Sequence, residues 1–68
     1  MKEKFENMVR EFKRELIDDY SEGKITEYQF DDLYFSIDNM VYTYYSGCDA
    51  TKMIELLDCF KAAYETMK

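Results

Sequence analysis

Hydrophobic residues recur every three or four positions along most of the chain, which is the spacing of one face of an α-helix. The first such stripe consists of Phe5, Met8, Val9, Phe12, Leu16 and Tyr20. The second consists of Phe30, Leu33, Ile37, Val41 and Tyr44. The third consists of Met53, Ile54, Leu56, Leu57, Phe60, Ala63, Tyr64 and Met67. These stripes predict three helices, over about 3–21, 27–46 and 50–67.

The residues between the stripes supply the signals that end and begin helices. Gly23 stands where a glycine commonly closes a helix in the left-handed conformation. Thr26 and Gln29 match the capping box, and Asp49 is a candidate N-cap for the last helix. Short connections make consecutive helices antiparallel neighbours. We therefore expect an all-α fold, a small three-helix bundle that forms one domain over residues 1–68.

Composition narrows the classes of protein that the chain can represent. Of its 68 residues, 47% are hydrophobic and none is proline, so we expect a folded chain. The net charge is −6, so we expect the chain to be repelled by nucleic acid and by anionic membranes. No apolar run is long enough to cross a bilayer. Two cysteines form no disulfide framework. We expect Cys59 in the core, Cys48 in the second connection, and a reduced, cytoplasmic protein.

Candidate catalytic chemistry is sparse. The chain contains no histidine, so neither cysteine has the usual base that would activate it as a nucleophile. The adjacent carboxylates Asp31 and Asp32, like Asp18 and Asp19, point in different directions on a helix and do not form an acid–base pair. The sequence therefore predicts no enzyme, no cofactor and no metal site.

The stretch from Asp18 to Gln29 resembles an EF-hand loop, with Gly23 at the sixth position. That resemblance implies a calcium site, but Tyr20 replaces a ligand and Gln29 replaces the bidentate glutamate, so we expect no calcium binding. The sequence Glu22-Gly23-Lys24-Ile25-Thr26, followed by Phe30, also resembles the helical hairpin of short bacterial C-terminal (SHOCT-type) domains. This second resemblance implies a hairpin and no activity.

Carboxylates and tyrosines alternate along one arc of the central predicted helix, beside its hydrophobic stripe. The arc holds Glu27, Asp31, Tyr34, Asp38, Tyr42 and Tyr45, with Phe35 at its edge. Buried carboxylates require charge partners, and tyrosine is enriched at binding hot spots. We expect this arc to be an exposed partner-binding surface, although the other helices would cover Tyr34 and Phe35 if the bundle buried both arcs. The surface is extended by Asp18, Asp19 and Glu22.

Acidic residues are concentrated between Glu15 and Asp49, where nine acids accompany one base. In size, acidity and absence of a catalytic set, the chain resembles small phage-encoded inhibitors of host defence, such as anti-CRISPR proteins and other DNA mimics. That resemblance implies a protein-binding inhibitor that acts in the host cytoplasm and occupies a basic, nucleic-acid-binding surface of another protein. The alternative is a structural or regulatory bundle that forms a homodimer through the tyrosine-rich face.

Overall fold

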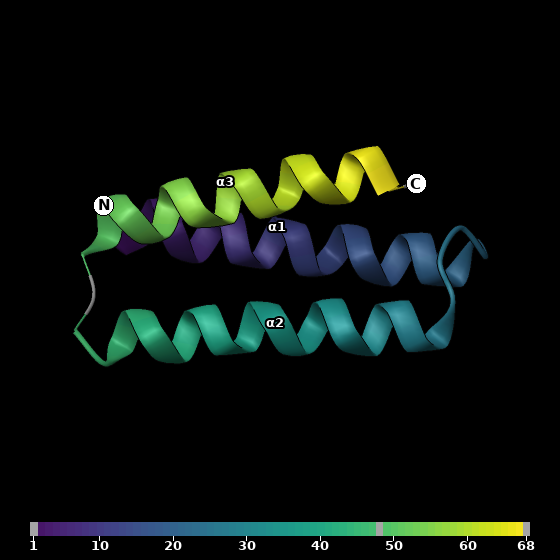
Figure 1. The fold of residues 1–68 in the computed structure, drawn as a ribbon, viewed down its shortest axis with the longest axis horizontal. Helices are drawn as coiled ribbons and strands as arrows, with labels where there is room; N and C mark the ends of the chain where they lie inside the picture. Colours follow the sequence, from purple (N-terminus) through teal and green to yellow (C-terminus); the bar gives the residue numbers. More distant parts are fainter. Residues whose placement is uncertain (1, 48, 68) are drawn as a thin grey trace.

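A computed structural model describes residues 2–47 and 49–67 as three helices with two short connections between them (Figure 1). The helices are α1 (Lys2–Ser21), α2 (Glu27–Tyr45) and α3 (Ala50–Met67). No strand occurs in these residues, and the helix ends lie within one residue of the positions expected from the sequence. The predicted all-α, three-helix bundle is confirmed.

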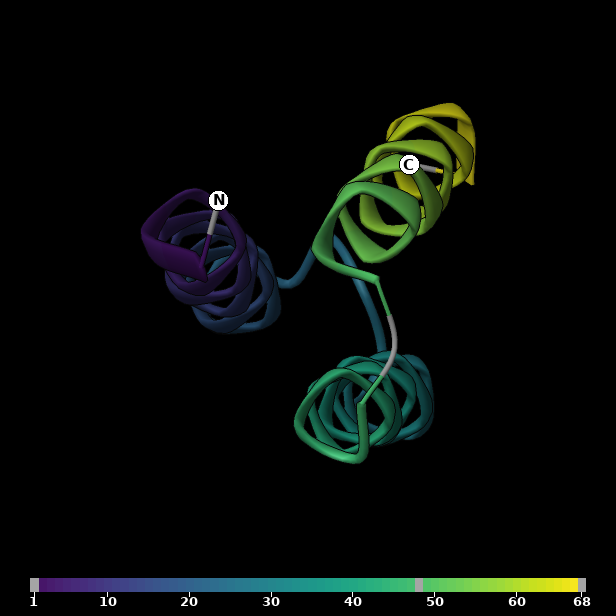
Figure 2. The ribbon, with the colours of Figure 1, turned by 90° about the vertical axis from the view of Figure 1, so that its left-hand side faces the viewer.

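The three helices occupy the corners of a triangle when the bundle is viewed along its length (Figure 2). Each helix contacts both of the others, and each connection reverses the direction of the chain. Because every helix has two neighbours, each turns one face inward and leaves the opposite face open to solvent.

The hydrophobic core is supplied unequally by the three helices. The buried hydrophobic positions of α1 and α3 are Phe5, Val9, Phe12, Leu16, Met53, Ile54, Leu57 and Tyr64. Phe12 is central to this core, since its ring lies 5.7 Å from that of Phe60 and 5.6 Å from that of Tyr64. In contrast, Ile37 is the only fully buried residue of α2, and Ile25 adds a buried side chain from the first connection. Helix α2 therefore rests on the core largely through half-buried side chains.

Local interactions set the start of α2 and of α3. The backbone N–H of Gln29 donates to Thr26 Oγ1 at 3.1 Å, and Gln29 Oε1 accepts from the backbone N–H of Thr26 at 2.9 Å, which confirms the capping box. Gly23 has a φ of 79°, a left-handed conformation that a side chain would strain. Asp49 Oδ1 accepts from the backbone N–H of Thr51 at 2.8 Å, as an N-cap does.

The expected position of one cysteine is wrong. Cys59 is exposed, because it lies on the outer side of α3 between the inward-facing Leu57 and Phe60. Leu56 and Met67, which belong to the predicted third stripe, are likewise about half exposed, at 54% and 50%. The predicted third stripe is therefore wider than the buried face of α3, because only a narrow arc of this helix faces the core. The expectation for Cys48 lies outside the described residues.

Candidate protein-binding face on α2

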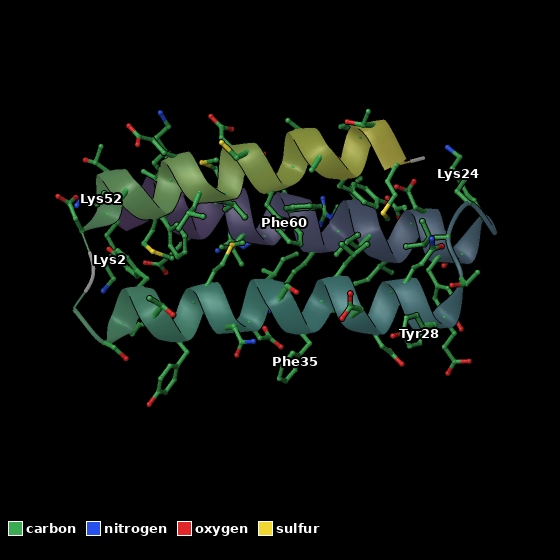
Figure 3. All side chains as sticks on the ribbon, in the orientation of Figure 1. Lys2, Lys24, Tyr28, Phe35, Lys52 and Phe60 are labelled. Atoms are coloured by element: carbon green, nitrogen blue, oxygen red, sulfur yellow. The ribbon has the colours of Figure 1, made fainter. Side chains whose placement is uncertain are left out.

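Three aromatic side chains form an exposed row along the outer side of α2. We call Tyr28, Phe35 and Tyr42 the aromatic ridge, and their exposed fractions are 82%, 65% and 76%. Successive members are seven residues apart, close to two helical turns, so they lie nearly in line along the helix. Figure 3 shows Phe35 pointing away from α1 and α3. Single exposed hydrophobic residues are ordinary, whereas exposed apolar residues gathered on one face mark a candidate interaction site.

The position of the ridge follows from which arc of α2 faces the core. Ile37 is fully buried, and it lies roughly opposite Phe35 around the helix at about 100° per residue. The half-buried side chains Phe30, Leu33 and Val41 pack against the core from either side of Ile37. Ile37 and these half-buried side chains occupy the core-facing arc of α2, so the aromatic ridge contributes little to the core.

Carboxylates flank the aromatic ridge on both sides. A residue three positions after a ridge member lies about 60° to one side of it, and a residue four positions after lies about 40° to the other. Asp31 and Asp38 occupy the first kind of position, and Asp32 occupies the second. All three residues are exposed. The outer face of α2 therefore combines an apolar centre with an acidic border.

A lysine from α1 reaches one edge of this border. Lys13 Nζ lies 2.6 Å from Asp38 Oδ1, and it sits 4.7 Å from the centre of the Tyr34 ring. Tyr34 is half-buried as a result and belongs to the α1–α2 contact. The negative charge of Asp38 is partly compensated, whereas Asp31 and Asp32 make no side-chain ion pair in the described residues.

An open depression of about 300 Å³ lies in the groove between α1 and α2. Phe5, Val9 and Val41 supply its apolar lining, and Tyr45 closes the side next to the C-terminal end of α2. The remaining lining comes from Glu6, Arg10 and Lys13 of α1. Since Tyr45 follows Tyr42 by three residues, the depression adjoins the last member of the aromatic ridge.

The residues expected to bind a partner have different environments in the structure. Those that are exposed are Asp18, Glu22, Glu27, Asp31, Asp38, Tyr42 and Tyr45. Within this group, Glu22 pairs with Lys24 at 3.0 Å in an exposed salt bridge. Tyr34 is half-buried, and Asp19 is only 4% exposed, so Asp19 is not part of an open surface. The surface predicted from the sequence does not include Tyr28, and it has Phe35 only at its edge. The seven-residue spacing of Tyr28 and Phe35 is the sequence signal that identifies both.

Asp19 instead joins two helices inside the bundle. The Tyr64 hydroxyl donates a hydrogen bond to Asp19 Oδ2, and Tyr64 is 1% exposed. Burying a carboxylate is unfavourable unless hydrogen-bond donors replace its water. The bond therefore fixes the end of α1 against the last turns of α3.

Replacing Tyr64 with phenylalanine should lower the free energy of unfolding by about 1–3 kcal/mol, because a buried oxygen of Asp19 loses this donor. Urea unfolding followed by circular dichroism measures the change. The matched control is Tyr42→Phe, which removes the same hydroxyl from an exposed ring and should change the free energy by less than about 0.5 kcal/mol. Equal effects of the two substitutions would show that the buried hydrogen bond adds nothing.

No group of three or more histidine, cysteine, aspartate or glutamate side chains within residues 2–47 and 49–67 is arranged to hold a metal ion. In the EF-hand-like stretch, Gln29 serves the capping box and Asp19 accepts from Tyr64, so both side chains have structural roles.

None of the helices in the described part of the chain has the length and apolar character needed to cross a bilayer. Comparisons with protein-family models, curated proteins and solved structures find no match for the chain.

Proposed function

We propose that the chain is a protein-binding module that attaches, through the outer face of α2, to a basic surface of another protein. The observation that carries this proposal is the aromatic ridge, exposed along its whole length and bordered by Asp31, Asp32 and Asp38. Aromatic rings supply most of the binding free energy at many interfaces, and surrounding charges select the partner and speed its approach. Attachment would block the partner's basic surface.

Inhibition of a nucleic-acid-binding protein is the specific form of this function that the acidity favours. A DNA duplex carries about one charge per 1.7 Å of its length. Helix α2 is about 28 Å long and carries only four carboxylates, at Glu27, Asp31, Asp32 and Asp38. Charge alone is therefore too sparse to replace a duplex, and the ridge must provide much of the affinity. An inhibitor of this kind would exclude nucleic acid by covering its site.

Reversing Asp31 and Asp32 to lysine should reduce capture of the partner at least about tenfold, because two favourable charge contacts become repulsive. The measurement is affinity capture from a lysate of the cells in which the chain is native, followed by mass spectrometry. Asp38 is left unchanged because it pairs with Lys13. Capture should also weaken as salt rises, and an added oligonucleotide should compete if the covered surface binds nucleic acid.

The matched control reverses Glu55 and Asp58, which are exposed on α3 away from the ridge, and should leave capture unchanged. The proposal fails if both charge-reversal variants retain the same proteins as the wild type. It also fails if the wild type retains none.

A further inference from the structure

The arrangement of the ridge indicates the shape of the partner, and this inference rests on the proposed function. The ridge runs for 14 residues from Tyr28 to Tyr42, about 21 Å along the axis of α2. A seven-residue repeat is the spacing at which one helix keeps touching a second helix wound along it. An amphipathic helix binds in the same way when its apolar residues contact successive anchors on a receptor. The row therefore has the geometry of a seam for one added helix.

The charge on α2 indicates the chemistry of that helix. Acidic residues border the ridge beside Tyr28 and Phe35, but Tyr45 takes the corresponding position after Tyr42. Between Tyr42 and the end of α2 there is no carboxylate, and the depression, which Val41 and Tyr45 line from α2 and charged side chains of α1 line in part, opens beside this end. A complementary helix needs basic residues along one half and large apolar residues along the other.

A second copy of the chain lacks this complementarity when the two ridges face each other. Residues 27–45 contain four carboxylates and no lysine or arginine, so two such faces would repel. Lys13, which reaches α2 from α1, is already paired with Asp38. A foreign helix that carries its own basic residues avoids both problems.

We infer that the outer face of α2 binds a basic amphipathic helix of a partner protein. The helix lies along the aromatic ridge, its lysine or arginine residues face Asp31 and Asp32, and its apolar end faces Tyr42 and Tyr45. One large apolar side chain of that end enters the depression between α1 and α2. This arrangement adds a fourth helix to the bundle without moving the other three.

Selection from a phage-displayed library of random 20-residue peptides, with the 68-residue chain as bait, tests the inference. The expected peptides contain lysine or arginine together with apolar residues at three- and four-residue spacing. They should gain helical circular dichroism on binding, and a Phe35→Ala/Tyr42→Ala bait should bind them at least about 30-fold more weakly. A Leu56→Ala bait, which loses an exposed apolar side chain on α3, should bind them as the wild type does.

Peptides that are acidic or extended, that lack the apolar spacing, or that bind the Phe35→Ala/Tyr42→Ala bait equally well overturn the inference, as does the recovery of no peptide. These outcomes leave the proposed function standing if lysate capture still depends on Asp31 and Asp32. Light scattering tests self-association, because it measures the oligomeric state. Both proposals would be overturned if the wild type were a dimer and Phe35→Ala/Tyr42→Ala converted it to a monomer.

Discussion

Replacing Phe12 with alanine should lower the free energy of unfolding by about 3–5 kcal/mol, because a fully buried ring is removed from a packed core. The ring contacts Phe60 and Tyr64 on α3, so its loss leaves a cavity between two helices. A domain of 68 residues has a total stability of roughly 3–10 kcal/mol at 0.05–0.15 kcal/mol per residue. The substitution should therefore remove a large part of the total stability, and thermal unfolding followed by circular dichroism should show a much lower midpoint.

Phe35→Ala is the matched control for this substitution, since it removes the same ring from a side chain that is 65% exposed. Its stability should equal or slightly exceed that of the wild type, because alanine is the better helix former. A loss of several kcal/mol from Phe35→Ala would mean that the ridge belongs to the core, and the proposed binding face would have to be abandoned.

The second large effect concerns binding. Phe35→Ala and Tyr42→Ala should each weaken the complex with the captured partner by about 2 kcal/mol, or about 30-fold in Kd, because large aromatic side chains dominate interface energies. Both variants should remain folded, since neither ring is buried. Isothermal titration calorimetry gives the affinity, and circular dichroism on the same samples verifies the fold.

Leu56→Ala serves as the control for binding. Leu56 is 54% exposed on α3, so its replacement removes comparable apolar surface from a different face of the bundle. Its affinity for the partner should match that of the wild type. If all three alanine variants bound normally, the partner would have to contact another part of the molecule.

The fold was predictable from the sequence because its strongest signals are local. Phe5, Val9, Phe12 and Leu16 repeat at helical spacing with little ambiguity, and all four are buried. The start of α2 was equally predictable, since Thr26 and Gln29 lie three residues apart and need only each other to form the capping box.

The candidate site was less predictable because α2 carries aromatic residues both on its core-facing arc and on its outer face. Periodicity shows which residues share an arc, but it does not fix how far the inner arc extends around the helix. The extent of the core-facing arc depends on interactions between residues that are distant in sequence. Lys13 reaches Asp38 across 25 positions, and Tyr64 reaches Asp19 across 45. Lys13 also lies over the ring of Tyr34, and Asp19 is buried where it meets Tyr64.

Helix α2 places a single residue, Ile37, fully inside the bundle, and this has a consequence for how the protein can change over time. Mutations on the outer half of α2 escape the selection for stability that constrains the core of α1 and α3. The outer face of α2 can therefore change in sequence while the scaffold is retained. The same separation makes the bundle a starting point for engineering, because new binding specificities can be installed on α2 by replacing surface residues alone.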